Sequence, residues 1–103
     1  MKTINYVLLQ GTAHQLGEGY DYLASHGLLA PEKYREVYRN TIEVEETEEP
    51  METLERLFSI FNRDDRPNGQ SGWSMSMGDI TEMNGVAYLF DRFGFVRLEN
   101  WGC

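Results

Sequence analysis

The alternation of apolar residues at the N-terminus predicts a strand. Its two alternating sets are both largely apolar, with Ile4, Tyr6 and Leu8 in one set and Asn5, Val7 and Leu9 in the other. A strand of this kind is usually covered on both faces, which suits a central position in a small sheet. Between residues 16 and 24 the apolar spacing becomes helical, and it ends at His26-Gly27, where glycine can take the left-handed conformation that caps a helix.

The middle of the chain predicts a second strand and a longer helix. Pro31 can open a turn, after which apolar and polar residues alternate from about Val37 to Val44, as in a half-buried strand. The clearest helix follows Pro50, because apolar residues occupy positions i, i+3, i+4 and i+7: Leu54, Leu57, Phe58 and Phe61. At 100° per residue, Glu48, Glu52 and Glu55 are predicted to form a stripe on the opposite, solvent-facing side.

The C-terminal third predicts an antiparallel meander. Residues 62–72 are rich in Asp, Asn, Gly and Pro and indicate a loop, after which apolar residues alternate with serines from 73 to 77. Asn84-Gly85 lies between apolar runs and favours the two-residue hairpin turn that needs positive backbone angles. A second turn at 92–94 would return residues 95–98 along the sheet.

These elements predict a single α+β domain spanning residues 1–103, with a mostly antiparallel sheet of four to five strands and two to three helices. A chain of 103 residues that is 41% hydrophobic and 13% aromatic can bury one modest core. Cys103 is the single cysteine, so no internal disulfide can form, and a cytoplasmic location is expected. No apolar stretch approaches the roughly 20 residues of a membrane span. Exposed sheet edges are compatible with a monomer or a weak homodimer.

Charge changes this picture most between residues 43 and 55. Seven of these thirteen residues are glutamate and none is basic, so the segment accounts for nearly all of the formal net charge of −8. Such a block is either a solvated surface or a surface for a cationic partner, and both interpretations stay open on charge alone. In the second, repeated carboxylates imitate a nucleic-acid backbone. The candidate partner-binding residues are Glu45, Glu46, Glu48, Glu49, Glu52 and Glu55.

Other chemistry is weakly supported. The glutamates match no calcium-loop pattern and no His or Cys cluster accompanies them, so neither a metal nor a cofactor is expected. His14 and His26 are interpreted as structural or surface histidines. No spacing rule places Asp64, Asp65 or Asp79 beside a nucleophile, and catalytic activity is therefore not expected.

Two segments with aromatic residues are candidate binding surfaces. The tyrosines of residues 20–38 lie among both basic and acidic residues, so no basic patch results and direct nucleic-acid binding is disfavoured. Trp73, Met75 and Met77 fit either core packing or an adaptable docking edge.

A motif in the C-terminal third resembles a known family. It consists of Ser74-Met75-Ser76-Met77-Gly78-Asp79-Ile80, then Asn84-Gly85, Tyr88 and Asp91-Arg92-Phe93-Gly94-Phe95. This is similar to the YodL-like domain, and the preceding helix and loop resemble that family as well. Gly78 and Arg92 stand where serines are usual. A structural role is predicted for Ser74, Ser76, Asp79, Asp91 and Gly94, with the aspartates accepting backbone N–H bonds and glycine allowing a reversal.

The resemblance implies a small α+β domain of plasmids, conjugative elements and phages of Firmicutes, often encoded beside antirestriction genes. Some small acidic proteins from that setting are anti-CRISPR inhibitors of type II effector nucleases. We therefore expect a non-enzymatic inhibitor that places its acidic surface in the basic guide-RNA or DNA channel of such a nuclease. Two alternatives remain: an enzyme or nuclease cofactor that alters guide RNA, and an interaction module that regulates conjugation or antirestriction.

Overall fold

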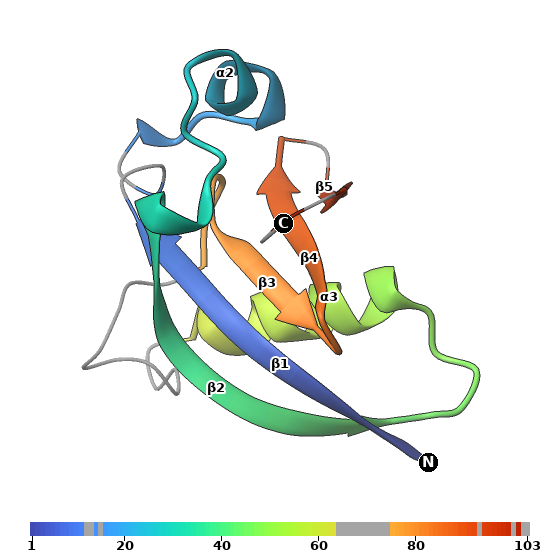
Figure 1. The fold of residues 1–103 in the computed structure, drawn as a ribbon. Helices are drawn as coiled ribbons and strands as arrows, with labels where there is room; N and C mark the ends of the chain where they lie inside the picture. The colour runs from blue at the N-terminus through green and yellow to red at the C-terminus, as the bar shows by residue number, and fades with distance from the viewer. Residues whose placement is uncertain (12–13, 15, 64–74, 93, 100, 102–103) are drawn as a thin grey trace.

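The computed structural model describes residues 1–11, 14, 16–63, 75–92, 94–99 and 101. Five antiparallel strands form one sheet in the order β2-β1-β3-β4-β5. The strands are β1 (Lys2–Gly11), β2 (Tyr34–Val44), β3 (Ile80–Met83), β4 (Val86–Asp91) and β5 (Gly94–Leu98). The helices are α2 (Tyr20–Ser25), the 3-10 turn η1 (Pro31–Lys33) and α3 (Pro50–Phe61). The predicted α+β class and mostly antiparallel sheet are confirmed (Figure 1).

The two faces of the sheet carry separate cores. On one face α3 buries Leu54, Leu57 and Phe61 against side chains of β1, β2 and β4. On the other face a smaller cluster joins Leu23 of α2 to β3, β4 and β5. Alternating residues of one strand therefore enter different cores, as Tyr88 and Leu89 do in β4.

The strand β1 lies inside the sheet, paired with β2 on one side and β3 on the other, as its two apolar faces predict. Pairing with β2 shifts between Leu8 and Leu9, where Tyr38 and Glu36 are the successive partners and Val37 is left over. This extra residue is a β-bulge, and it lets Val37 and Tyr38 both contact the α3-side core.

The hairpin between β3 and β4 has the predicted turn. Asn84 and Gly85 have φ angles of 49° and 85°, the positive values that a type I′ turn requires at both central residues. The Asn84 side chain also accepts a hydrogen bond from the Asn5 backbone N–H at 3.0 Å, which ties the turn to β1. The helix cap is likewise as predicted, since Gly27 follows α2 with a φ of 67°.

Two predicted elements differ from the structure. Residues 75–77 are not in a strand, because buried Met75 packs into the α3-side core and the following residues turn into β3. Trp73 and Ser74 lie outside the described residues. The helix expected from residue 16 is interrupted, because Gly17 has a φ of 65°, residues 17–19 are not helical, and α2 spans only Tyr20–Ser25. Within the described part of the chain, no helix has both the length and the apolar character to cross a membrane.

Candidate functional site

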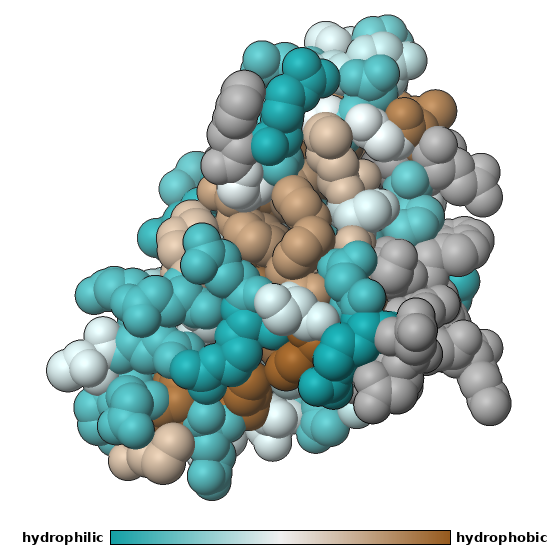
Figure 2. Space-filling model, turned by 180° about the vertical axis from the view of Figure 1, so that it is seen from behind, coloured by the Kyte–Doolittle hydropathy of each residue, from teal (hydrophilic) through white to brown (hydrophobic). Residues whose placement is uncertain are grey.

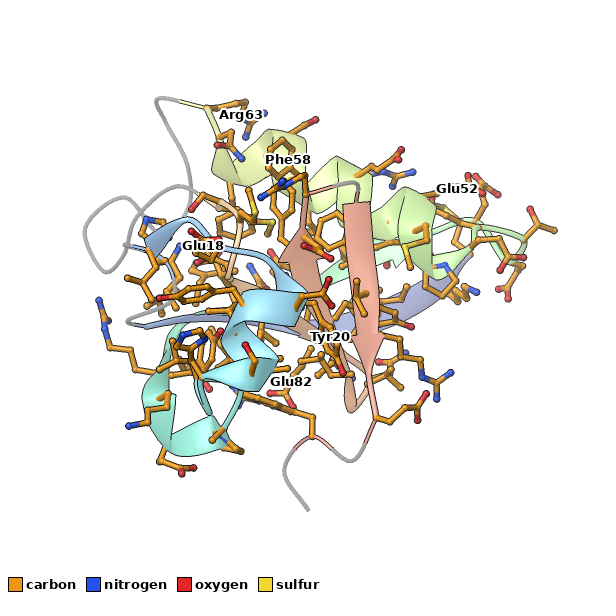
Figure 3. The ribbon with its side chains drawn as sticks, turned by 90° about the horizontal axis from the view of Figure 1, so that it is seen from above. Glu18, Tyr20, Glu52, Phe58, Arg63 and Glu82 are labelled. Atoms are coloured by element: carbon orange, nitrogen blue, oxygen red, sulfur yellow. The ribbon has the colours of Figure 1, made fainter. Side chains whose placement is uncertain are left out.

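Glutamates of the acidic block surround the start of α3, and six of the seven are exposed. The exposed members are Glu43, Glu45, Glu46, Glu49, Glu52 and Glu55, which we call the acidic surface. They come from the end of β2, the connection after it and the first half of α3. Figure 3 shows Glu52 in this region, near the start of the helix. The chain therefore exposes six carboxylates on the residues that lead into α3 and on its first half.

Glu48 is the exception, and its predicted place on the solvent-facing stripe is wrong. It precedes α3 instead of lying within it, and its side chain is only 5% exposed. The Thr53 hydroxyl donates to its Oε2 at 2.5 Å, and the Arg56 guanidinium donates to Oε1. Its charge is therefore balanced inside the molecule by Arg56, because a buried carboxylate needs donors and an opposite charge.

Part of the acidic surface also stabilises the helix start. The Glu49 side chain accepts a bond from the backbone N–H of Glu52, and the Glu52 side chain accepts one from the backbone N–H of Glu49 at 3.5 Å. This reciprocal capping box satisfies backbone donors that have no partner within the helix. Glu46 lies 3.4 Å from the N-terminal ammonium group of Met1. Glu46, Glu49 and Glu52 thus have local roles while remaining exposed to solvent.

An aromatic groove adjoins the acidic surface between α3 and the β4–β5 turn. It has a volume of about 340 Å³ and is lined by Glu55, Phe58, Ser59, Phe90, Gly94 and Phe95. The Phe58 and Phe90 ring centroids are 4.7 Å apart in an edge-on contact, and those of Phe90 and Phe95 are 5.1 Å apart. Figure 2, which views the molecule from behind, shows apolar side chains in the middle of a face that is otherwise largely hydrophilic.

The family-like motif forms a buried polar cluster around Asp79. One carboxylate oxygen accepts bonds from the Gln10 side-chain amide and the Ser76 backbone N–H, both at 2.9 Å. The other oxygen lies 2.9 Å from Nδ1 of His14. Asp79 and Gln10 are almost completely buried. Burial raises the pKa of Asp79, and hydrogen bonds from Ser76, Gln10 and His14 oppose that rise.

The hydroxyl of Ser76 completes this cluster without forming a hydrolytic triad. It lies 3.1 Å from Nδ1 of His14, the same ring nitrogen that contacts Asp79. A serine-hydrolase triad places the carboxylate and the hydroxyl on different ring nitrogens. Tyr34 donates to the Gly78 carbonyl at 2.7 Å, and burial, followed by the nearby Asp79 charge, raises its pKa. The contacts of Asp79 therefore connect His14, strand β1 and the residues that lead into β3.

Asp91 performs a similar task at the C-terminal end of β4, the end at which the Phe90 backbone N–H donates to the Asp79 carbonyl. Its Oδ1 accepts backbone N–H bonds from Arg92 at 2.7 Å and from Tyr20 at 3.2 Å. A side chain at Gly19 would place its Cβ 2.0 Å from the same oxygen, so glycine permits this approach of α2 to Asp91. Gly94 opens β5 with a φ of 129°, a value that a residue with a side chain adopts only under strain.

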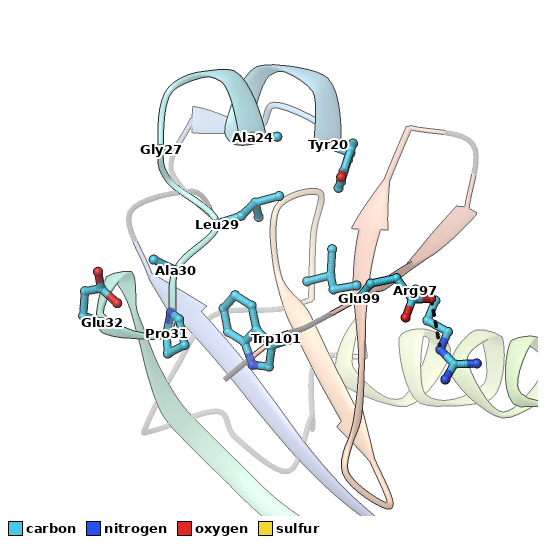
Figure 4. A pocket seen from close by; sticks show the side chains of 11 residues that line it. Tyr20, Ala24, Gly27, Leu29, Ala30, Pro31, Glu32, Arg97, Glu99 and Trp101 are labelled. Atoms are coloured by element: carbon cyan, nitrogen blue, oxygen red, sulfur yellow. Dashed lines mark ion pairs between the residues drawn. The ribbon is translucent and has the colours of Figure 1, made fainter. Parts of the chain in front are cut away.

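A larger cleft lies on the other side of the sheet, between α2, η1 and the residues after β5. Its volume is about 750 Å³. Trp101 lies opposite Leu29 and Pro31, while the exposed Arg97 and Glu99 side chains are 3.8 Å apart (Figure 4). The lining is a mixture of apolar and charged residues of both signs. It offers no concentration of one charge comparable with the acidic surface.

Sequence reasoning missed the aromatic groove and the contact of His14 with Asp79. The helical spacing groups Phe58 with Leu54, Leu57 and Phe61, but Phe58 is only partly buried. Phe58 follows Glu55 by three residues, and residues three apart share a helix face. This spacing could have indicated that Phe58 lies beside an exposed carboxylate. No comparable signal links His14 to Asp79, since they are 65 residues apart. The Trp73, Met75 and Met77 edge is not observed as such: Met75 is buried, and Trp73 lies outside the described residues.

Comparison with known proteins identifies one related family. The model of the YodL-like domain matches residues 6–100, which is nearly the whole chain. Neither a curated protein nor a solved structure matched the chain.

Proposed function

The chain belongs to the YodL-like domain family, and we propose that this member is a non-enzymatic inhibitor that binds the basic guide-RNA or DNA channel of a type II CRISPR effector nuclease. The observation that carries the proposal is the exposure of six glutamates around the start of α3. Glu48 is withdrawn from the binding residues, because Arg56 and Thr53 occupy its carboxylate. The proposed contact is the acidic surface as defined above.

Electrostatics explains how such a surface would act. Glu52 and Glu55 are three residues apart on α3, which places their Cβ atoms about 5 to 6 Å from each other. Together with the exposed glutamates before α3, this pair supplies repeated negative charge to a groove whose arginines and lysines normally bind phosphates. Three described arginines have carboxylate partners outside this surface: Arg39 binds Glu36, Arg56 binds Glu48, and Arg97 lies beside Glu99. Binding of this kind associates quickly and weakens as salt increases.

The proposal is tested by cleavage assays with purified type II effector nucleases. The protein is added either before or after the guide RNA, and cleavage of a target DNA is measured. We expect the protein to reduce cleavage most when it precedes the guide RNA, because it competes for the same basic channel. The guide RNA is labelled, so that new RNA fragments, which would favour the alternative of a nucleic-acid-altering enzyme, are seen in the same experiment.

Two variants with equal changes in charge separate a specific surface from net charge. One replaces Glu45, Glu52 and Glu55 by glutamine. The control carries Asp21→Asn, Glu32→Gln and Glu99→Gln, which alter exposed carboxylates near α2, η1 and the end of β5.

We expect the first variant to lose most of its inhibition and the control to retain it. Equal inhibition by both folded variants, or no inhibition of any type II effector by the unmodified protein, would contradict the proposal. Circular dichroism and thermal unfolding establish that both variants are folded.

A further inference from the structure

The aromatic groove is a surface feature attached to, and not part of, the α3-side core. Leu54, Leu57 and Phe61 fill the interior beneath α3 and are fully buried. Phe58, Phe90 and Phe95 are only partly buried, and their rings form a continuous row across the groove. The row brings together the middle of α3 and both sides of the β4–β5 turn. A hollow of about 340 Å³ with this lining is large enough to receive an apolar side chain.

Acidic and apolar residues continue from this groove along one side of α3. Met51, Glu55 and Phe58 are spaced i, i+4 and i+7 and therefore share a helix face. Met51 is 43% exposed, and its flexible side chain suits contact with an irregular partner surface. Glu55 is exposed and lines the groove itself, and Glu52 lies one turn nearer the helix start. The same face thus offers an aromatic hollow with carboxylates directly beside it.

The charge beside the groove selects among occupants. Arg56 follows Glu55 in sequence, but its guanidinium is directed to Glu48. A second copy of this chain would bring another formal charge of −8 toward the same carboxylates, and like charges repel. A basic segment would instead gain attraction from Glu52 and Glu55 while burying an apolar side chain.

We propose that the aromatic groove anchors one apolar side chain of a partner-protein segment, while a lysine or arginine of the same segment binds Glu55 and Glu52. The identity of the partner protein rests on the proposed function. The chemistry of the bound segment does not, because it is inferred from the groove and its carboxylates alone. The groove would supply a central desolvated contact, and the carboxylates would orient the segment around it. Interfaces commonly have this arrangement of a buried anchor and a charged rim.

The test uses selection of peptides from a random library displayed on phage, with the immobilised full chain as bait. We expect the enriched sequences to share an apolar residue with at least one lysine or arginine within about four positions, the reach of neighbouring residues on one face. A synthetic peptide of the enriched sequence is then titrated by fluorescence anisotropy. Enriched peptides without a basic residue, or the absence of any enriched sequence, would overturn the proposal.

Variants locate the bound peptide. We expect Phe95→Ala to weaken binding about 30-fold or more, as truncation of an aromatic anchor does. Glu55→Gln should weaken it less, and its effect should disappear in high salt, since a rim charge is screened. Glu32→Gln is the control, because Glu32 is exposed and lines the cleft on the other side of the sheet. Unchanged affinity of a folded Phe95→Ala variant would refute the assignment of the groove.

Nuclear magnetic resonance of the unmodified protein keeps the proposal testable if Phe95→Ala fails to fold. Backbone signals of residues near Phe58, Phe90 and Phe95 should shift on addition of the selected peptide. Shifts confined to the region of Trp101 would overturn the assignment. None of these experiments contains a nuclease, so a failure here leaves the cleavage assay to decide the proposed function on its own. Conversely, peptide binding without nuclease inhibition would support the groove as a binding site and exclude the nuclease as its partner.

Discussion

The carboxylate of Asp79 and the exposed carboxylates at the start of α3 have opposite surroundings. Asp79 is 1% exposed and has bonds to Gln10, Ser76 and His14. Glu52 and Glu55 are exposed, and the Glu52 carboxylate has a capping bond at 3.5 Å. A buried charge without donors costs several kcal/mol, so the first environment requires the surrounding donors, whereas water satisfies the second.

Glu48 shows that position in the sequence does not decide between the two environments. It belongs to the acidic block by sequence, yet it has the buried surroundings of Asp79, with Thr53 and Arg56 as its donors. In one acidic block, therefore, a buried carboxylate that stabilises the fold lies beside exposed carboxylates that are available to a partner. Only the available ones can contribute to a partner surface without loss of stability.

The largest effect is expected from removing the buried acceptor of the motif. Asp79→Ala should lower the free energy of unfolding by about 3 kcal/mol, because the Gln10 amide and the Ser76 N–H lose their acceptor in a buried site. Asp91→Ala is the matched control. It removes bonds from Arg92 and Tyr20 at a less buried position and should cost about 0.5 to 2 kcal/mol, as loss of a cap does. Urea denaturation measures both, and an equal loss would contradict the contrast.

Glu48 should rank second. Glu48→Ala leaves the Thr53 hydroxyl and the Arg56 guanidinium without their carboxylate, and we expect a loss of about 1.5 to 3 kcal/mol, the range for hydrogen bonds to charged groups. Glu45→Ala, at an exposed position three residues earlier, should change stability by less than about 0.5 kcal/mol. If thermal and urea unfolding of the two variants coincided, the contacts of Glu48 with Thr53 and Arg56 would not stabilise the fold, and the prediction would be wrong.

Local patterns were sufficient to predict most of the fold. The period of Leu54, Leu57 and Phe61 located α3, and Asn84-Gly85 located the hairpin, because each signal is contained within a few consecutive residues. Over residues 75–77 the alternation is misleading, since burial of Met75 in the α3-side core overrides the local preference for a strand.

The candidate site was less predictable because it depends on contacts between distant segments. The acidic surface could be predicted from composition, but not the loss of Glu48 to Arg56. That pairing joins residues before and within α3 through a side-chain geometry that a count of charges cannot resolve. The aromatic groove required the β4–β5 turn to be placed against α3. Only the fold brings Phe90 and Phe95 to Phe58.

A smaller effect is expected in the dependence of stability on pH. Burial raises the pKa of Asp79 above its ordinary value of 3.8, so the folded state binds its proton more tightly than the unfolded state does. This contribution is fully present below pH 3.8 and is lost as the pH rises through the raised native pKa. Asp79→Asn removes it. We therefore expect the stability difference, unmodified minus variant, to shrink as pH rises over this range.

Urea midpoints of both proteins at closely spaced pH values measure that difference. The exposed glutamates are identical in the two proteins, so their contribution cancels in the comparison. The difference therefore reports the Asp79 carboxylate together with its interactions with His14 and Tyr34, the titratable groups that face it. A difference that grew with pH would mean that hydrogen bonds from Gln10 and Ser76 outweigh burial in setting the native pKa.

The smallest stability effect should come from the exposed side of the comparison. Glu52→Gln with Glu55→Gln should change the free energy of unfolding by less than about 0.5 kcal/mol. Removing repulsion between two carboxylates one turn apart is favourable, while losing a negative charge from the first turn of α3 is unfavourable, so the two changes offset each other. The glutamine at position 52 retains a side-chain oxygen for the capping box. Urea denaturation at low and high salt tests this, because both electrostatic contributions should diminish together as salt is added. A loss of more than 1 kcal/mol would make these glutamates structural, and the contrast with Asp79 and Glu48 would no longer hold.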